Sequence, residues 1–328
     1  MKSMKTIKQY LITGGAGFIG SHLAERLLSQ PGVAVTCIDN FDDFYPVSQK
    51  RENLKGLLEH PNFQFIEADI SQQEYLLDVL KGQTFEAIIH LAAKAGVRKS
   101  IESTRPYYES NVMGTLSLLE VARHLSIQKF IFASSSSVYG QNPNVPWKES
   151  DTNLLPISPY ASSKISGEML GRTYAHLHGI QFLALRFFTV YGSRQRPDLA
   201  IHKFAELILE AKPITLYGDG STRRDYTHVS DIVTGIEQAM AYEKPGFETF
   251  NLASGKPVTL RKLVASLEVA LGREAIYEYR EEQPGDVSQT YADLNKSQEL
   301  LGYQPVVTLE EGLKEFVRWK TSLPHLTH

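Results

Sequence analysis

The chain has 328 residues, more than one compact core usually holds, so we expect one large domain with a smaller partner. A hydrophobic fraction of 42% and a charged fraction of 22% exclude a disordered or fibrous protein. The 34 lysines and arginines nearly balance 37 aspartates and glutamates, which argues against a nucleic-acid-binding surface or a polybasic membrane anchor. The single cysteine, Cys37, excludes an internal disulfide and suits a reducing cytosol, and we expect neither a secretory signal nor a membrane span.

Short apolar segments alternate with helical patterns over the first part of the chain. The segments typical of buried parallel strands are residues 10–13, 33–38, 63–66, 87–91, 130–133 and 181–187. Helical spacing follows over 18–29, 111–126 and 158–177. Strands that alternate with helices form right-handed βαβ units. The predicted fold class is therefore α/β, a Rossmann-type doubly wound parallel sheet.

From residue 189 onward, glycine, proline and arginine interrupt the pattern, which predicts a smaller α+β C-terminal lobe that binds substrate. Two helices are expected within it, over 260–271 and 309–320. The predicted division gives 1–188 to the Rossmann domain, with 225–248 returning to it, and 189–224 with 249–328 to the lobe.

A glycine-rich turn lies between the first predicted strand and the first predicted helix. Gly14, Gly17 and Gly20 have the spacing that allows a tight turn, approach of the backbone to a pyrophosphate, and close packing of helix on strand. The helix N-terminus then offers free N–H groups to the phosphates. Asp39 follows the second strand, where a carboxylate can bond both hydroxyls of an adenosine ribose and repel a 2′-phosphate. Such a turn can occur alone, but together these features predict NAD rather than NADP.

Tyr160 and Lys164 are four residues apart and share one face of a predicted helix. A free tyrosine has a pKa near ~10, and a neighbouring ammonium and the positive nicotinamide would lower the pKa of this phenol toward that of a usable base. The same spacing also fits an ordinary surface helix; behind a dinucleotide-binding pattern it predicts a catalytic pair. The serines at 134–137 directly follow an inner strand, where ligands bind in open sheets. One of them could relay the proton of a reacting alcohol, while others satisfy loop backbone.

These motifs, with the segment 223–226, resemble the extended short-chain dehydrogenase/reductase family, and most of all its nucleotide-sugar 4-epimerases. The resemblance implies a catalytic triad of Ser135, Tyr160 and Lys164, a tightly bound NAD, and a homodimer joined through two helices per subunit, for which 103–125 and 158–177 are candidates. The residues expected to bind NAD are Gly14, Gly17, Phe18, Ile19, Gly20, Asp39, Asn40, Asp43, Asp69, Ile70, Leu91, Ala92, Ala93, Tyr160 and Lys164.

The resemblance also bears on the reaction. Sugar 4,6-dehydratases carry an Asp-Glu pair where this chain has Ser136 and Ser137, and UDP-xylose-forming decarboxylases typically have a glutamate in place of Ser137. Two hydroxyls cannot easily replace the acid and base that elimination needs. Oxidation at C4 and re-reduction from the other face remain, so the expected reaction is epimerisation.

The segments 39–45 and 194–198 resemble UDP-glucuronate 4-epimerases more than UDP-galactose ones. Thr189 and Arg196 match positions that hold the uronate carboxylate in that subgroup, although Arg196 could equally form a loop salt bridge or contact a phosphate. Arg224 and Asp286 match contacts to the diphosphate and the uridine ribose. The expected substrate-binding residues are Arg98, Ser136, Ser137, Thr189, Arg196, Arg224 and Asp286.

Three alternatives stay open. Two are enzymes: an epimerase for UDP-glucose or UDP-N-acetylglucosamine, and a UDP-glucuronate decarboxylase. The third, from a different class, is a catalytically silent NAD-binding sensor; such proteins often lose the tyrosine or lysine that this chain keeps. No metal is expected, because His22, His90, His228 and Cys37 lack metal-ligand spacing and fit structural roles.

Overall fold

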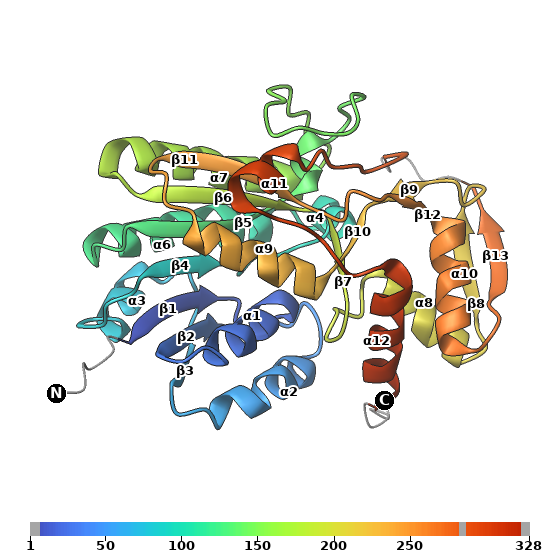
Figure 1. Ribbon diagram of the computed structural model, residues 1–328, viewed down its shortest axis with the longest axis horizontal. Helices are drawn as coiled ribbons and strands as arrows, with labels where there is room; N and C mark the ends of the chain where they lie inside the picture. Colours follow the sequence, from blue (N-terminus) through green and yellow to red (C-terminus); the bar gives the residue numbers. More distant parts are fainter. Residues whose placement is uncertain (1–6, 282–286, 323–328) are drawn as a thin grey trace.

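The computed structural model describes residues 7–281 and 287–322, which are built around a seven-stranded parallel sheet (Figure 1). The strand order is β11-β6-β5-β4-β1-β2-β3, and every neighbouring pair is parallel. This arrangement confirms the predicted Rossmann-type doubly wound sheet. Its strands are β1 (Lys8–Thr13), β2 (Val33–Asp39), β3 (Phe63–Glu67), β4 (Ala87–His90), β5 (Lys129–Ser135), β6 (Gln181–Phe187) and β11 (Phe247–Leu252).

Helices bury both faces of the sheet, which is why its strands are apolar almost throughout. Adjacent residues such as Leu11 and Ile12 point to opposite faces, and each is fully buried in a different apolar cluster. One cluster is covered by α1 (Phe18–Leu28), α2 (Val47–Leu58) and α9 (Val229–Ala241). The other is covered by α3 (Gln73–Val79), α6 (Gly114–His124) and α7 (Pro159–His178).

A smaller group of elements has its own apolar core and lies beside one end of the sheet (Figure 1). It contains α8 (Ala200–Leu209), β8 (Pro213–Tyr217), α10 (Leu260–Leu271), β13 (Ile276–Arg280) and α12 (Leu309–Ser322). Short strand pairs connect it to the large sheet: β7 (Thr189–Tyr191) with β10 (Tyr226–His228), and β9 (Arg223–Arg224) with β12 (Val258–Thr259). Helix α11 (Asn295–Leu301) lies against β11.

Two local features differ from the predicted elements. The helix expected over 111–126 begins as a π-helical turn, η1 (Glu109–Met113), preceded by the short helices α4 (Val97–Glu102) and α5 (Arg105–Tyr108). Strand β11 continues to Leu252, beyond the segment 225–248 that was expected to return to the sheet. Polar residues in β11 weaken the apolar pattern by which a strand is predicted. One of them, Asn251, is fully buried, and its side-chain oxygen accepts a hydrogen bond from Tyr139. The lobe boundaries themselves stay a prediction.

Helix α7 packs on the sheet at a distance that only glycine permits. A Cβ at Gly167 would lie 2.4 Å from Cζ of Phe132, and a Cβ at Gly171 would lie 2.3 Å from the ring of Phe182. Both phenylalanines are buried in the sheet and packed by neighbours. The two glycines therefore allow α7 to lie close to β5 and β6, the strands that carry Phe132 and Phe182.

Gly167→Ala is expected to lower the free energy of unfolding by about 1–3 kcal/mol, because the extra methyl overpacks a filled core. Gly56→Ala is the matched control: Gly56 is an exposed residue inside α2, a Cβ added there would have nothing within 4 Å, and alanine should stabilise that helix by about 0.5–1 kcal/mol. Urea unfolding of the two variants measures both effects. Equal changes of the same sign would contradict this account of α7.

Candidate active site

A cavity of about 530 Å³ opens at the sheet edge where β1, β2, β4 and β5 end, and residues of the smaller lobe close its other side. This is the edge at which open parallel sheets bind ligands. The predicted site residues that line it are Gly14, Gly17, Phe18, Ile19, Gly20, Asp39, Asn40, Asp69, Ile70, Leu91, Ala92, Ala93, Ser135, Ser136, Ser137, Tyr160, Lys164, Thr189, Arg196 and Arg224.

Two predicted residues, Asp43 and Arg98, do not lie on this surface, and a third cannot be placed. Asp43 does not line the cavity; its neighbour Asp42 does, because the Asp42 carboxylate pairs with Lys94 Nζ at 2.7 Å. The guanidinium of Arg98 lies over the ring of Tyr217, 5.6 Å from its centroid, and Arg98 is not a lining residue. Asp286 lies outside the described residues.

The glycine-rich turn brings backbone into contact with backbone. Gly14 has φ +72°, and a Cβ at Gly20 would lie 2.2 Å from the Gly14 carbonyl oxygen, so a side chain there would push the helix off the strand. The Asp39 carboxylate accepts hydrogen bonds from the backbone N–H groups of Ala16 at 3.2 Å and Phe41 at 2.9 Å. Burial raises the pKa of Asp39, and the Lys50 ammonium, 3.7 Å away, opposes that shift.

The side chains beside this turn fit a dinucleotide. The Tyr45 hydroxyl is buried, lines the cavity, and has no hydrogen-bond partner within the part of the chain that the structure describes. It lies 4.0 Å from the position that a Cβ on Gly17 would take, and the Lys50 ammonium lies 4.9 Å from the centre of its ring. A phosphate at the glycine turn would supply an acceptor for this hydroxyl and a second negative charge beside the lysine.

Asp39→Ala is expected to weaken NAD binding about 10–100-fold, because it removes charge-assisted hydrogen bonds to the ribose. Titration of the NAD-free protein with NAD measures the loss. Asp43→Ala is the matched control, because Asp43 lies outside the cavity lining. This variant should bind NAD with the affinity of the parent protein. Equal affinity of the Asp39 variant and the parent would remove Asp39 from the ribose site.

Helix α7 and the end of β5 bring Ser135, Tyr160 and Lys164 to one cavity. Lys164 donates a hydrogen bond to the Ala133 carbonyl oxygen at 2.8 Å and its Nζ lies 5.9 Å from the centre of the Tyr160 ring. Burial lowers the pKa of Lys164 to about 7, against an opposing effect of Glu168. The lysine is therefore close to its titration point at neutral pH.

The groups that shift the pKa of the Tyr160 phenol differ from those expected. Burial raises the pKa of Tyr160, and a hydrogen bond with Ser135 and the charge of Arg196 oppose that shift, in that order. Lys164, whose ammonium donates to the Ala133 carbonyl on β5, is not among these influences. A positive group bound beside Tyr160 is thus still needed to make the phenol an effective base.

The four serines divide into distinct roles. Ser134 also lines the cavity, but its hydroxyl donates to Glu168 Oε1 at 2.5 Å. Ser135 caps the turn η2 (Ser136–Tyr139), accepting from the Ser137 backbone N–H at 3.2 Å, and donates to the Ser137 hydroxyl at 3.1 Å. Ser135, Ser136 and Ser137 all face the cavity, where hydroxyls can contact a ligand.

Arg196 lies at the boundary between the lobes. Its Nε and Nη2 bond the two carboxylate oxygens of Asp198 at 2.9 and 3.0 Å, and its guanidinium lies 5.2 Å from the centre of the Phe44 ring. The side chain is 18% exposed and lines the cavity together with Thr189. Sequence reasoning missed the partner Asp198 and the lining residue Phe44, although the segments that resemble UDP-glucuronate epimerases contain both.

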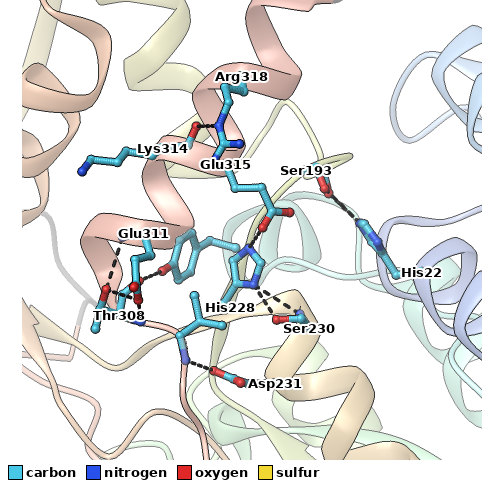
Figure 2. A network of polar contacts seen from close by, with 12 residues as sticks. His22, Ser193, His228, Ser230, Asp231, Thr308, Glu311, Lys314, Glu315 and Arg318 are labelled. Carbon is cyan, nitrogen blue, oxygen red and sulfur yellow. Dashed lines mark hydrogen bonds and ion pairs between the residues drawn. The ribbon is translucent and has the colours of Figure 1, made fainter.

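Figure 2 shows polar contacts around His228 and a separate contact between His22 and Ser193, and the latter joins α1 to the segment between β7 and α8 that carries Arg196. His228 at the end of β10 lies between Glu315 of α12, at 3.6 Å, and the Ser230 hydroxyl, at 2.8 Å. His22 of α1 contacts the Ser193 carbonyl oxygen at 3.0 Å. These contacts agree with structural roles for both histidines, and the described residues contain no group of three or more side chains that could hold a metal.

A doubly wound sheet with a glycine turn, a carboxylate (Asp39) at the end of the second strand and a Ser-Tyr-Lys set at one cavity defines an extended short-chain dehydrogenase/reductase. The chain belongs to the GDP-mannose 4,6-dehydratase family, whose family model matches residues 11–316. No helix in residues 7–281 and 287–322 combines the length and apolar character needed to cross a membrane.

Curated relatives and solved structures resemble the chain over nearly its full length. A UDP-glucuronate 4-epimerase of Thermodesulfobacterium geofontis is 42% identical over 313 residues, covering 94% of this chain and 95% of that protein. The UDP-glucuronic acid 4-epimerase from Bacillus cereus, solved with UDP-glucuronic acid and NAD, is 37% identical, with a TM-score of 0.88 over 95% of this chain and 99% of that one. The UDP-glucose 4-epimerase of Thermotoga maritima, solved with UDP-glucose, is 34% identical, with a TM-score of 0.87 over 95% and 98%.

Proposed function

We propose that this protein catalyses the NAD-dependent epimerisation of a UDP-sugar at C4, with UDP-glucuronate and UDP-galacturonate as its substrate and product. The observation that carries the proposal is the convergence of Tyr160, Lys164 and Ser135 with Arg196 and Thr189 on one cavity. The Thermodesulfobacterium and Bacillus relatives named above support the same reaction and the same cofactor.

In the proposed mechanism the protein's own groups hold and move one proton. Tyr160, as phenolate, removes the proton of the sugar 4-hydroxyl, and Ser135 holds that hydroxyl by a hydrogen bond. Lys164 supplies positive charge beside the reacting centre and a donor for the nicotinamide ribose. NAD⁺, when bound at the glycine turn, supplies the hydride acceptor and then the hydride donor. The 4-keto sugar turns about its diphosphate link, and Tyr160 returns the proton to the new alcohol.

The family model is named for a dehydratase, but among the described residues the loop after β5 offers no acid and base pair for dehydration. Ser136 and Ser137 present hydroxyls where sugar dehydratases carry an acid and a base. Elimination across C5 and C6 requires proton removal from carbon and protonation of the leaving hydroxyl. A neutral serine pair supports neither step efficiently, so the 4-keto sugar is reduced again rather than dehydrated.

The uronate imposes a second requirement on the site. A 4-keto uronic acid is a β-keto acid, which loses CO₂ when its breaking bond lines up with the carbonyl π system. The Arg196 guanidinium, with the Thr189 hydroxyl, would fix the carboxylate out of that alignment. Epimerisation without decarboxylation thus depends on how firmly the carboxylate is held.

A neutral UDP-hexose is the second candidate, because Asp198 already occupies two nitrogens of Arg196 and the Thermotoga relative was solved with UDP-glucose. Parallel assays with UDP-glucuronate and UDP-glucose decide between them. We expect turnover of UDP-glucuronate; an inert UDP-glucuronate with active UDP-glucose would overturn the carboxylate assignment. Release of CO₂ as the main outcome would instead establish a decarboxylase.

An isotope experiment tests the reaction class independently of the sugar. Substrate carrying deuterium at C4 should give product that keeps its label, because the same hydrogen leaves and returns within the closed site. Product that has exchanged its label with water would rule out this mechanism. Protein that binds NAD but turns over no UDP-sugar would favour the silent sensor.

We further propose a homodimer formed through the region of α6 and α7. Three apolar side chains in this region are exposed in the single chain: Met113 at 53%, Met169 at 44% and Leu177 at 63%. Burying such side chains against a second copy is favourable. Sedimentation analysis should give twice the chain mass, and Met169→Glu should shift the particle towards the monomer; a monomeric parent protein would refute this.

A further inference from the structure

We infer that Glu168, paired with Arg186, is a positioning residue for the reaction: it holds Lys164 charged and fixes the serine-bearing end of β5 against the catalytic helix. Glu168 belongs to none of the sequence motifs described above, and it lies behind the cavity rather than in its lining. The inference rests on the proposed function in using C4 epimerisation as its measurement.

Glu168 ties together the three elements from which the site is built. It lies on α7 one turn beyond Lys164, which itself lies one turn beyond Tyr160, so all three share a helix face. Its Oε1 accepts from Ser134 at 2.5 Å, on β5 immediately before Ser135. Movement of this carboxylate would therefore shift the serine relative to the phenol.

The third element is β6, through a bidentate ion pair. Arg186 donates from Nε to Glu168 Oε1 at 2.9 Å and from Nη2 to Oε2 at 2.8 Å. Glu168 is 0% exposed and Arg186 is 3% exposed, so solvent screens this pair weakly. The Arg186 guanidinium lies 4.8 Å from the centre of the Tyr139 ring, which fixes its plane as well.

Lys164 needs such a partner, because it is buried where an ammonium is costly. Its Nζ lies 5.0 Å from the centre of the Phe132 ring and donates its hydrogen bond to a neutral carbonyl, that of Ala133. Burial lowers the pKa of Lys164 to about 7, and the Glu168 carboxylate is the charge that opposes this shift. Without that carboxylate, less of the lysine would carry its positive charge at neutral pH.

The other ionisable groups around Lys164 cannot take this role. Tyr160 on α7 is neutral at rest because burial raises its pKa, and Arg186 on β6 carries the same sign of charge as the lysine. His90 on β4 stays neutral because burial lowers its pKa to about 3, with the Lys164 charge adding to that shift. Among these neighbours, Glu168 alone supplies negative charge.

The sign of the expected pH effect follows. The ammonium of Lys164 is lost as pH rises through its pKa, so this group sets the limb of the activity profile near pH 7. Removing the Glu168 charge lowers the pKa of Lys164 and moves that limb to lower pH, by about one unit. The limb set by deprotonation of Tyr160 lies at higher pH, because burial raises the pKa of that phenol, and it should stay in place.

The test is the pH profile of kcat for the NAD-loaded enzyme carrying Glu168→Gln. We expect kcat at pH values above this limb to fall roughly tenfold, as a one-unit displacement of the limb requires. Glu168→Asp keeps the charge and should keep the limb near its original position. A Glu168→Gln limb at the parental pH, or an identical shift in both variants, would overturn the inference.

Because glutamine leaves Arg186 unpaired in the core, a second variant guards against misfolding. The double variant Glu168→Gln, Arg186→Met replaces the ion pair with neutral groups of similar volume, which folded proteins often tolerate. Its limb near pH 7 should also move to lower pH; an unmoved limb would mean that the pair serves only the fold. The parent enzyme, measured in the same assay, tests the proposed function separately. An inactive parent would refute that function, whereas an active parent with an unmoved limb in the variants would refute the role of Glu168.

Glu120→Gln is the matched control. Glu120 on α6 also bonds α7, through the Tyr174 hydroxyl at 2.5 Å, but Tyr174 is ten residues beyond Lys164, roughly 15 Å along the helix. This variant removes an interhelical carboxylate without changing the charge near the lysine. Its profile should match the parent in shape.

Discussion

Tyr160→Phe is expected to lower kcat for UDP-sugar epimerisation by about 10³-fold or more while the protein still binds NAD. The substitution removes one oxygen atom, and with it the group that takes and returns the hydroxyl proton; general base catalysis is commonly worth about 10²–10⁴-fold, and here the same group acts twice. A coupled assay on UDP-glucuronate gives the rate. NAD content after denaturation of the purified variant gives the cofactor occupancy.

Tyr108→Phe provides the comparison for this variant. The Tyr108 hydroxyl bonds Ser162 at 3.0 Å, beside α7 but outside the cavity lining, so it tests the loss of a nearby phenol without loss of a base. We expect its kcat to stay within about threefold of the parent, as for a partly exposed hydrogen bond. Parental turnover by Tyr160→Phe would show that another group is the base.

Arg196→Ala should reduce kcat/KM for UDP-glucuronate by about 100-fold and for a neutral UDP-hexose far less, because only the uronate loses a charge-assisted contact. The product should change as well. With its carboxylate released, the 4-keto uronate can reach the geometry for loss of CO₂, so a larger share of turnovers should end as a pentose. Chromatography of the UDP-sugars and trapping of CO₂ measure both effects.

Arg194→Ala is the control on the same segment. Arg194 pairs with Glu25 at 2.6 Å and does not line the cavity, so its loss should affect both sugars equally. If Arg196→Ala instead weakened charged and neutral sugars by the same factor, the guanidinium would be assigned to the diphosphate. The ion pair with Asp198 would then be the structural contact that the sequence left open.

The residues that sequence alone could place are those whose chemistry depends on local spacing. Gly14, Gly17 and Gly20 belong to one turn, and Tyr160 and Lys164 to one helix face, so chain distance already fixes their geometry. Strand β6 and helix α10 were predicted at the bounds found, because a mainly apolar run and an amphipathic helix both give clear patterns.

Most features that escaped prediction depend on contacts between distant segments. Glu168 looks like any helical glutamate until the fold brings it to Arg186. Asp198 lies only two residues beyond Arg196, but the sequence does not specify how the turn directs the two side chains. The polar strand β11 lacks an apolar signature because Asn251 is satisfied by Tyr139 from another element. The effect of burial on the pKa of Tyr160 likewise required the folded environment.

The position of β11 also governs how the protein can be made. A ribosome completes β6 long before it delivers residues 247–252, yet β11 is the strand that pairs with the outer edge of β6, from Phe182 to Phe187. Until then the nascent chain presents an open, strongly apolar strand edge, the kind of surface that recruits other chains. Fragments that stop before residue 247 should therefore aggregate or stay bound to chaperones, even though they contain the whole glycine turn and the catalytic helix.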